Sequence, residues 1–147
     1  MSDVTIVSAR TIRLQARARD KTDAIRQVGE LLVAGGCVDP AYVDGMLARE
    51  RITSTYLGNG VAIPHGQNEN RSQVRRTGIA VLQLPEGVEW EPNELAYLVI
   101  GIAANDDDHV DVLTNLAELI EDPATAEQLA RTTDPLLIAG LLNGTRA

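Results

Sequence analysis

The sequence predicts an α/β fold, a single layered domain in which a mixed β-sheet is flanked by helices on both faces. Two continuous apolar runs, residues 78–84 and 95–104, are typical of strands that are buried on both faces. Segments with helical spacing of apolar residues lie before and after these runs. Strands between helical ends indicate a sheet that is covered on two sides. We therefore expect one domain over residues 1–147, with its core at about 11–143.

The N-terminal part predicts a strand followed by a helix. In residues 11–16 apolar and polar side chains alternate, which is the period of a half-buried strand. Asp20 can cap the helix that follows, because its carboxylate can accept hydrogen bonds from the first N–H groups. Gly35 and Gly36 then provide a stop after one apolar helix face.

Asp-Pro pairs mark the starts of three further helices. Asp is a favoured N-cap and Pro is favoured at the first helical position. Asp39 and Pro40 therefore predict a second helix, which apolar residues at helical spacing extend to about Glu50. The same pair at 122–123 and at 134–135 predicts two short C-terminal helices.

Between the two apolar runs the pattern is interrupted. Residues 85–87, Pro-Glu-Gly, end the first run. Residues 88–90 predict a short additional strand, and the acidic residues at 91–94 predict a surface loop before the second run.

The segment TSTYLGNGVAIPHGQ, residues 53–67, is the most informative for function. It contains a short apolar run of strand type that ends at His65, between Pro64 and Gly66. Binding sites in layered sheets gather at strand ends. A neutral imidazole is a good nucleophile near neutral pH and can accept and release a phosphoryl group. His65 is thus a candidate acceptor, with the nitrogen left open; the alternative is a histidine that only caps or packs at the strand end.

Two other residues can assist such chemistry. His109 lies in the first turn of a predicted helix, where the N–H groups and the helix dipole favour a bound anion. It can hydrogen-bond a phosphate on His65, or it can be a buried or capping histidine. Arg49 lies at the end of the second predicted helix, and its guanidinium fork suits transient phosphate charge. The alternative role of Arg49 is to complement the dipole of its helix.

Composition and spacing exclude several other classes. The net charge of −8 disfavours nucleic acid as a partner. We expect no metal, because no C-x-x-C or H-x-x-x-H spacing is present, and no cofactor, because no nucleotide-binding glycine loop is present. No apolar run approaches the roughly 18 residues of a membrane helix, and the start lacks the pattern of a secretory signal. With the lone Cys37, these features predict a cytoplasmic protein.

Three blocks of the sequence resemble enzyme IIA domains of the bacterial sugar phosphotransferase system, of the mannitol and fructose type. They are STYLGNGVAIPHG at 54–66, LPEGVEW at 84–90 and LVIGIAA at 98–104, the last followed by His109. The resemblance covers roughly residues 11–143, and the blocks look closest to the mannitol branch.

The resemblance implies both a fold and a relay. It implies a mixed sheet between helices, with the histidine of the IPHG motif, here His65, taking phosphate from the phosphocarrier protein HPr. The phosphate then passes to a cysteine of a IIB domain, here on a separate chain, for uptake of mannitol or a related polyol through the membrane-bound IIC permease. His109 and Arg49 match the assisting histidine and arginine of mannitol-type members.

Two alternatives to sugar transport stay open on the sequence. One is a regulatory module, as in the nitrogen-related branch of the family, whose phosphorylation state at His65 controls protein partners. The other is a stand-alone binding domain in which His65 is inert. An assay for phosphate acceptance and then for a IIB acceptor distinguishes the three.

Overall fold

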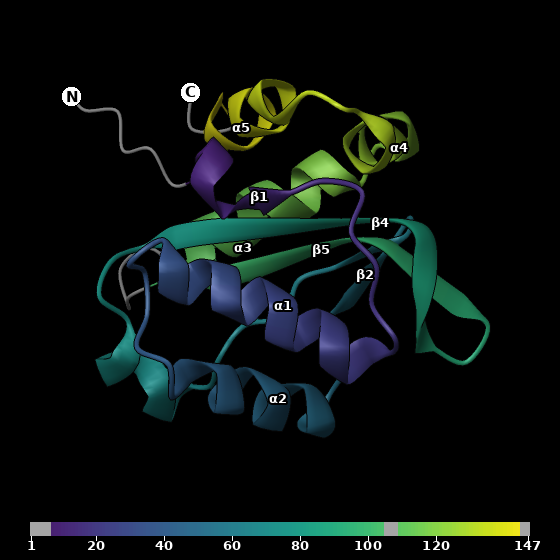
Figure 1. Ribbon diagram of the computed structural model, residues 1–147. Helices are drawn as coiled ribbons and strands as arrows, with labels where there is room; N and C mark the ends of the chain where they lie inside the picture. The colour runs from purple at the N-terminus through teal and green to yellow at the C-terminus, as the bar shows by residue number, and fades with distance from the viewer. Residues whose placement is uncertain (1–6, 105–108, 145–147) are drawn as a thin grey trace.

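The computed structural model describes residues 7–104 and 109–144, which form a sheet between two layers of helices (Figure 1). The sheet has five strands in the order β1-β4-β5-β3-β2. It is mixed, because β1 pairs with β4 and β3 with β5 in parallel, whereas β4 with β5 and β2 with β3 are antiparallel. The predicted α/β class, with helices on both faces, is confirmed.

The helices and strands occupy the following residues. In chain order they are η1 (Ala9–Thr11), β1 (Ile12–Arg13), α1 (Lys21–Ala34), α2 (Tyr42–Ile52), β2 (Tyr56–Gly58), β3 (Val61–Ala62), η2 (Asn68–Gln73), β4 (Gly78–Glu91), β5 (Glu94–Ala103), α3 (His109–Ile120), α4 (Pro123–Arg131) and α5 (Pro135–Gly144). In the two described ranges, no helix has the length and apolar content that crossing a bilayer requires.

The two long strands β4 and β5 are buried on both faces, as their sequences predict. Side chains alternate along a strand, so Val81 faces one helix layer and Leu82 the other. Val81 packs in the cluster formed with α3, α4 and α5, and Leu82 in the cluster formed with α1 and α2. Both residues are fully buried, and burial of each such side chain stabilises the fold by about 1.5–3 kcal/mol.

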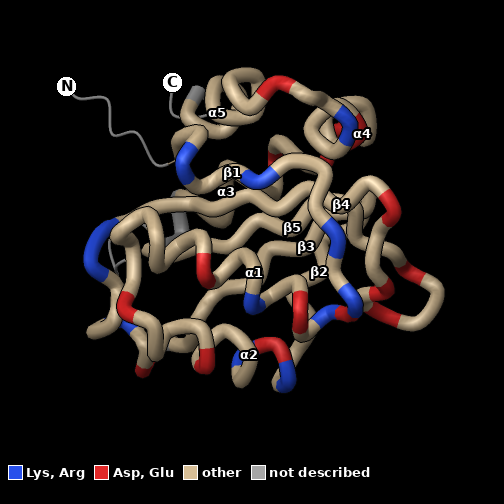
Figure 2. Tube along the Cα trace, viewed as in Figure 1, with Lys and Arg blue, Asp and Glu red and all other residues tan. Residues whose placement is uncertain are grey.

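The break expected between the two apolar runs is wrong in its details. Strand β4 continues to Glu91 through a register shift between Gln83 and Val88, where Gly87 has a φ of +75°. The predicted short strand at 88–90 is therefore part of β4. The acidic turn predicted at 91–94 is present as a tight hairpin turn, in which Glu91 pairs with Glu94 and Asn93 has a φ of 67°. Figure 2 shows acidic residues gathered on this projecting hairpin.

Three of the four predicted helix caps are confirmed and one is wrong. Asp134 accepts a bond of 3.0 Å from the Leu136 N–H at the start of α5. Asp20 accepts a bond of 2.8 Å from the Asp23 N–H, and Asp122 accepts one of 3.1 Å from the Ala124 N–H. Asp39 does not cap α2, which begins at Tyr42. Its carboxylate pairs with Arg75 at 2.7 Å, and its carbonyl closes a turn onto Tyr42. This turn starts the helix later than predicted, so Ala41 and not Asp39 stands at the cap position.

The first strand is shorter than predicted. Only Ile12–Arg13 pair with β4, although alternation extends over residues 11–16. Gln15 has a φ of 53°, and its N–H donates to the side chain of buried Gln83 at 3.1 Å. Because the Gln15 N–H bonds a side chain and not the backbone of β4, the β1–β4 pairing ends before Gln15.

Candidate active site

His65 lies just beyond β3, beside the C-terminal part of β5. The Pro64 carbonyl accepts a bond of 3.0 Å from the Ile102 N–H, and His65 forms an isolated parallel bridge with Ile102. Because β3 and β5 run parallel, His65 lies where both strands approach their carboxyl ends. The structure thus places the imidazole at the kind of sheet edge where ligands bind in layered α/β folds.

The imidazole has a defined tautomer. His65 is only 8% exposed, and its Nδ1 lies 2.9 Å from the Ile63 carbonyl oxygen. A carbonyl oxygen can only accept a hydrogen bond, so Nδ1 carries the proton. The lone pair of the neutral ring is then on Nε2. The sequence left the nucleophilic nitrogen open, and this geometry indicates Nε2.

His65 and Arg49 line one open pocket of about 520 Å³. Helix α2, the segment after β3, η2, the residue after β5 and helix α3 all border this pocket. Its lining consists of Tyr42, Arg49, Ile52, Thr53, His65, Gly66, Gln67, Arg71, Val74, Ala104 and Leu113. Two of the three candidate residues named from the sequence, His65 and Arg49, thus lie on the same pocket.

Arg49 holds the C-terminal end of its own helix and also borders the pocket. Its Nη1 donates at 2.6 Å to the carbonyl of Thr53, the residue that follows the last turn of α2. A guanidinium has five N–H donors in a fixed fork, so this bond fixes the group while other donors can meet an anion. Both roles considered for Arg49 are compatible with its position.

Helix α3 borders the same pocket through Leu113, and its first residue is His109. The side chain of His109 lies outside the described part of the structure. The role predicted for this histidine therefore stays a prediction.

Three pocket residues did not emerge from the sequence. Arg71 comes from η2 and adds a second arginine to the lining. Ile52 is 68% exposed at the end of α2, which is unusual for a large apolar side chain and gives the rim an apolar group. Tyr42 is buried below the loop that carries His65. Of these three residues, only Ile52 could have been found from the sequence, because it is an apolar residue at the otherwise polar end of the second predicted helix.

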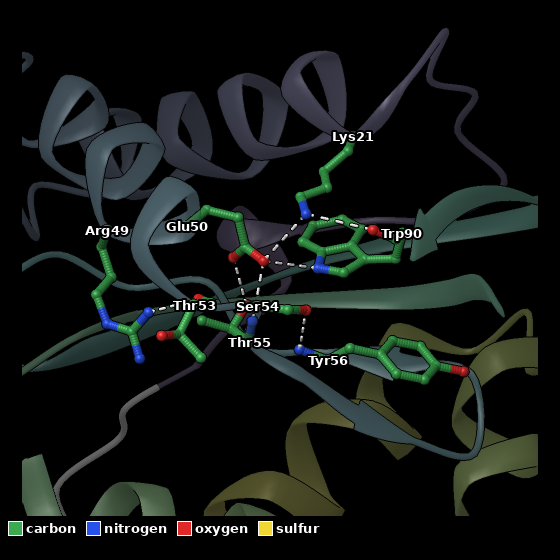
Figure 3. Close-up of polar contacts among 8 residues, drawn as sticks. All are labelled: Lys21, Arg49, Glu50, Thr53, Ser54, Thr55, Tyr56 and Trp90. Atoms are coloured by element: carbon green, nitrogen blue, oxygen red, sulfur yellow. Dashed lines mark hydrogen bonds and ion pairs between the residues drawn. The ribbon is translucent and has the colours of Figure 1, made fainter. Parts of the chain in front are cut away.

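A buried carboxylate anchors the segment between Arg49 and His65 (Figure 3). Glu50, 6% exposed, accepts from the Thr55 hydroxyl at 2.6 Å and from the Thr55 N–H at 2.9 Å. It also accepts from the Trp90 indole N–H at 3.0 Å. Lys21 lies 3.4 Å from the carboxylate and 5.6 Å from the centre of the Trp90 ring. Hydrogen bonds and a cation thus compensate the cost of burying this charge.

The described ranges contain no set of side chains that could form a metal centre. No group of three or more His, Cys, Asp or Glu side chains comes together there in a way that can hold a metal ion. The polar residues that do converge, His65 with two arginines, suit an anion.

Comparison with known proteins assigns the family. The family model described as "Phosphoenolpyruvate-dependent sugar phosphotransferase system, EIIA 2" matches residues 5–143. The multiphosphoryl transfer protein of Xanthomonas campestris pv. campestris is 56% identical over 136 residues, 92% of this chain. The chain spans only 16% of the length of that relative.

Two solved structures from Escherichia coli have the same fold. The crystal structure of IIA mannitol is 44% identical with a TM-score of 0.85, covering 92% of this chain and 97% of that one. The IIA component of a complex between enzyme IIAMTL and phosphorylated enzyme IIBMTL is 44% identical with a TM-score of 0.87, covering 93% and 96%. Since the family model spans nearly the whole sequence, this chain belongs to the EIIA 2 family and is a phosphotransferase component of the phosphoenolpyruvate-dependent sugar phosphotransferase system.

Proposed function

We propose that this chain is a mannitol-type phosphocarrier in which His65 accepts a phosphoryl group from phospho-HPr. The group then passes to a cysteine of a IIB domain, for uptake of mannitol or a related polyol. The observation that supports this most is the bond between His65 Nδ1 and the Ile63 carbonyl, 2.9 Å long. It gives Nε2 the lone pair that an acceptor of phosphate needs.

The transfer balances with these groups alone. The Nε2 lone pair attacks phosphorus, an Nε2–P bond forms, and the bond from phosphorus to the donor atom breaks with its electron pair returning to the donor. The proton stays on Nδ1 throughout, hydrogen-bonded to the Ile63 carbonyl. In the second step the IIB thiolate attacks phosphorus, an S–P bond forms, and the electron pair of the Nε2–P bond returns to His65.

Positive groups around the pocket support the roles given to the other residues. In phosphoryl transfer a protein contributes mainly by positioning the reactants and by electrostatic stabilisation of the equatorial oxygens. Arg49 and Arg71 line the pocket with His65 and have the chemistry for this task. We assign Arg49 to charge stabilisation and His109, at the start of α3, to a hydrogen bond with the phosphoryl group.

The mannitol assignment and the IIB partner draw on the relatives. The solved E. coli structures are of IIA mannitol and of a complex between enzyme IIAMTL and phosphorylated enzyme IIBMTL, and both cover nearly all of this chain. By analogy, this chain meets a IIB domain in the cytoplasm and reaches the membrane only indirectly, through the IIC permease.

The decisive experiment measures intact mass after incubation with phosphoenolpyruvate, enzyme I and HPr. One acid-labile phosphate should appear on the wild type only when HPr is present, and the His65→Ala variant should gain none. Acceptance by that variant would refute the assignment of His65. No phosphate on the wild type, with a donor proven active on another IIA domain, would reject the phosphocarrier function.

A second step separates transport from regulation. Phosphorylated protein is mixed with a mannitol-type IIB domain, and the mass of each partner is followed. Transfer to IIB supports transport. Acceptance without transfer, together with a partner that binds only one phosphorylation state, favours the regulatory module instead.

A further inference from the structure

The hydroxyl of Tyr42 lies between the two backbone groups that flank the candidate acceptor. It accepts a bond of 2.9 Å from the Gly66 N–H and donates one of 2.9 Å to the Ile102 carbonyl. Gly66 follows His65 in the chain, and Ile102 on β5 is the bridge partner of His65. One side chain from α2 therefore touches both sides of His65.

This hydroxyl bonds both backbone groups of the last pairing between the His65 segment and β5. In a regular parallel ladder with His65 opposite Ile102, the Ile102 N–H bonds to the carbonyl before His65, and the N–H after His65 bonds to the Ile102 carbonyl. The first bond is present at 3.0 Å, from Ile102 to Pro64. The Tyr42 hydroxyl bonds both the donor and the acceptor of the second bond. The bridge at His65 is isolated, so this hydroxyl supports the last point at which the chain pairs with β5.

Packing holds the tyrosine in this position. Tyr42 is 4% exposed, and its ring lies so close to Gly66 that a Cβ on that residue would be 2.6 Å from the ring. Any side chain at position 66 would therefore push the ring or the loop aside. Burial raises the pKa of the Tyr42 phenol, so the hydroxyl keeps its proton and can donate to Ile102.

We propose that Tyr42 is a positioning residue for phosphoryl transfer: its hydroxyl sets the backbone at His65 and so aims Nε2 into the pocket. This inference rests on the function proposed above. Tyr42 acts through the Gly66 and Ile102 backbone and has no bond to the reacting nitrogen. Without the hydroxyl, the Gly66 N–H and the Ile102 carbonyl either lose their partner or close onto each other, and both outcomes move His65.

The chain offers a matched control in Tyr56. Its hydroxyl also bridges two backbone groups, accepting from the Gly60 N–H at 3.1 Å and donating to the Leu95 carbonyl at 3.3 Å. Tyr56 does not line the pocket that holds His65. The Tyr56→Phe variant thus removes the same kind of bonds away from the candidate site.

The test compares initial rates of HPr-dependent phosphate incorporation in the wild type, Tyr42→Phe and Tyr56→Phe, with the folded fraction of each measured by thermal unfolding. We expect Tyr42→Phe to be folded and slower by at least about tenfold, because small misplacement of a reacting atom has large effects on rate. Tyr56→Phe should retain the wild-type rate. Equal rates for Tyr42→Phe and the wild type, or equal losses in both variants, overturn the proposal.

A second measurement separates this inference from the proposed function. In ¹⁵N spectra, Tyr42→Phe should shift the His65 ring nitrogens and the Gly66 amide, and Tyr56→Phe should leave them unchanged. If the wild type takes no phosphate, the function fails, while unchanged His65 resonances in Tyr42→Phe refute the positioning role on their own. If Tyr42→Phe does not fold, Gly66→Ala, which displaces the ring from the other side, must give the same shifts and the same rate loss.

Discussion

The Glu50 carboxylate accepts two hydrogen bonds from Thr55, one from its hydroxyl at 2.6 Å and one from its N–H at 2.9 Å. Two further bonds continue from there to the candidate acceptor. The Thr55 carbonyl accepts from the Ile63 N–H at 3.0 Å, and the Ile63 carbonyl contacts His65 Nδ1 at 2.9 Å. A buried carboxylate on α2 is thus connected to the imidazole through two residues of the intervening hairpin.

Loss of the Glu50 charge should destabilise the protein strongly. In Glu50→Gln an amide N–H₂ replaces one acceptor oxygen and faces donors from Thr55, Trp90 or Lys21, so at least one buried donor loses its partner. We expect the free energy of unfolding to fall by about 1–3 kcal/mol. Urea unfolding at pH 7 measures this change.

Glu127→Gln is the matched control for that experiment. Glu127 forms an ion pair with Arg131 at 3.0 Å, but both side chains are more than half exposed. Such a pair contributes about 0–1 kcal/mol. If the free energy of unfolding falls equally in the two variants, the buried network around Glu50 does not stabilise the protein more than an exposed ion pair does.

Arg49→Lys should slow phosphate acceptance while leaving the acceptor intact. Lysine keeps the positive charge but loses the planar fork that both holds the Thr53 carbonyl and meets phosphate oxygens. Loss of one charge-assisted hydrogen bond, about 1.5–3 kcal/mol, corresponds to a rate lower by about tenfold to a hundredfold. The initial rate of phosphate incorporation at saturating donor checks this.

Arg51→Lys supplies the comparison for Arg49. Arg51 lies in the last turn of the same helix, is exposed and does not line the pocket. Its variant should react like the wild type. A similar decrease in both variants would show that loss of a guanidinium anywhere at this helix end, and not the position of Arg49, lowers the rate.

Local signals in the sequence predicted the features that depend on local physics. Burial on both faces predicted β4 and β5, and the carboxylate of Asp20 predicted the start of α1. His65 and Arg49 could be named because their types and neighbours point to phosphoryl chemistry.

Features set by distant partners could not be predicted. Glu50 bonds Trp90, 40 residues away, and Tyr42 bonds Ile102, 60 residues away. A glutamate in a helix and a tyrosine near its start are ordinary surface choices until the fold brings their partners to them. Asp39 failed as a cap because the chain first makes a turn from Asp39 to Tyr42, which leaves Ala41 at the cap position of α2.

His109→Ala should decrease the rate of phosphate acceptance without removing the phosphorylation site. The reason is the position of residue 109 at the N-terminus of α3, which also contributes Leu113 to the pocket. Intact mass should still reach one phosphate per chain at long times. Equal rates for the variant and the wild type would assign His109 a structural role only.

Stability should fall at alkaline pH partly because of Cys37. Burial raises the pKa of this thiol above its ordinary value of 9.0, so the folded state holds the proton that the unfolded chain releases. Stability from this group is therefore complete below pH 9 and is lost as pH rises through the raised pKa. Urea unfolding at pH 7, 9 and 10 should show a steeper loss for the wild type than for Cys37→Ala. Tyr42 and Tyr56, whose pKa values burial also raises, retain their effect in both proteins, so parallel curves would exclude the thiol as a cause.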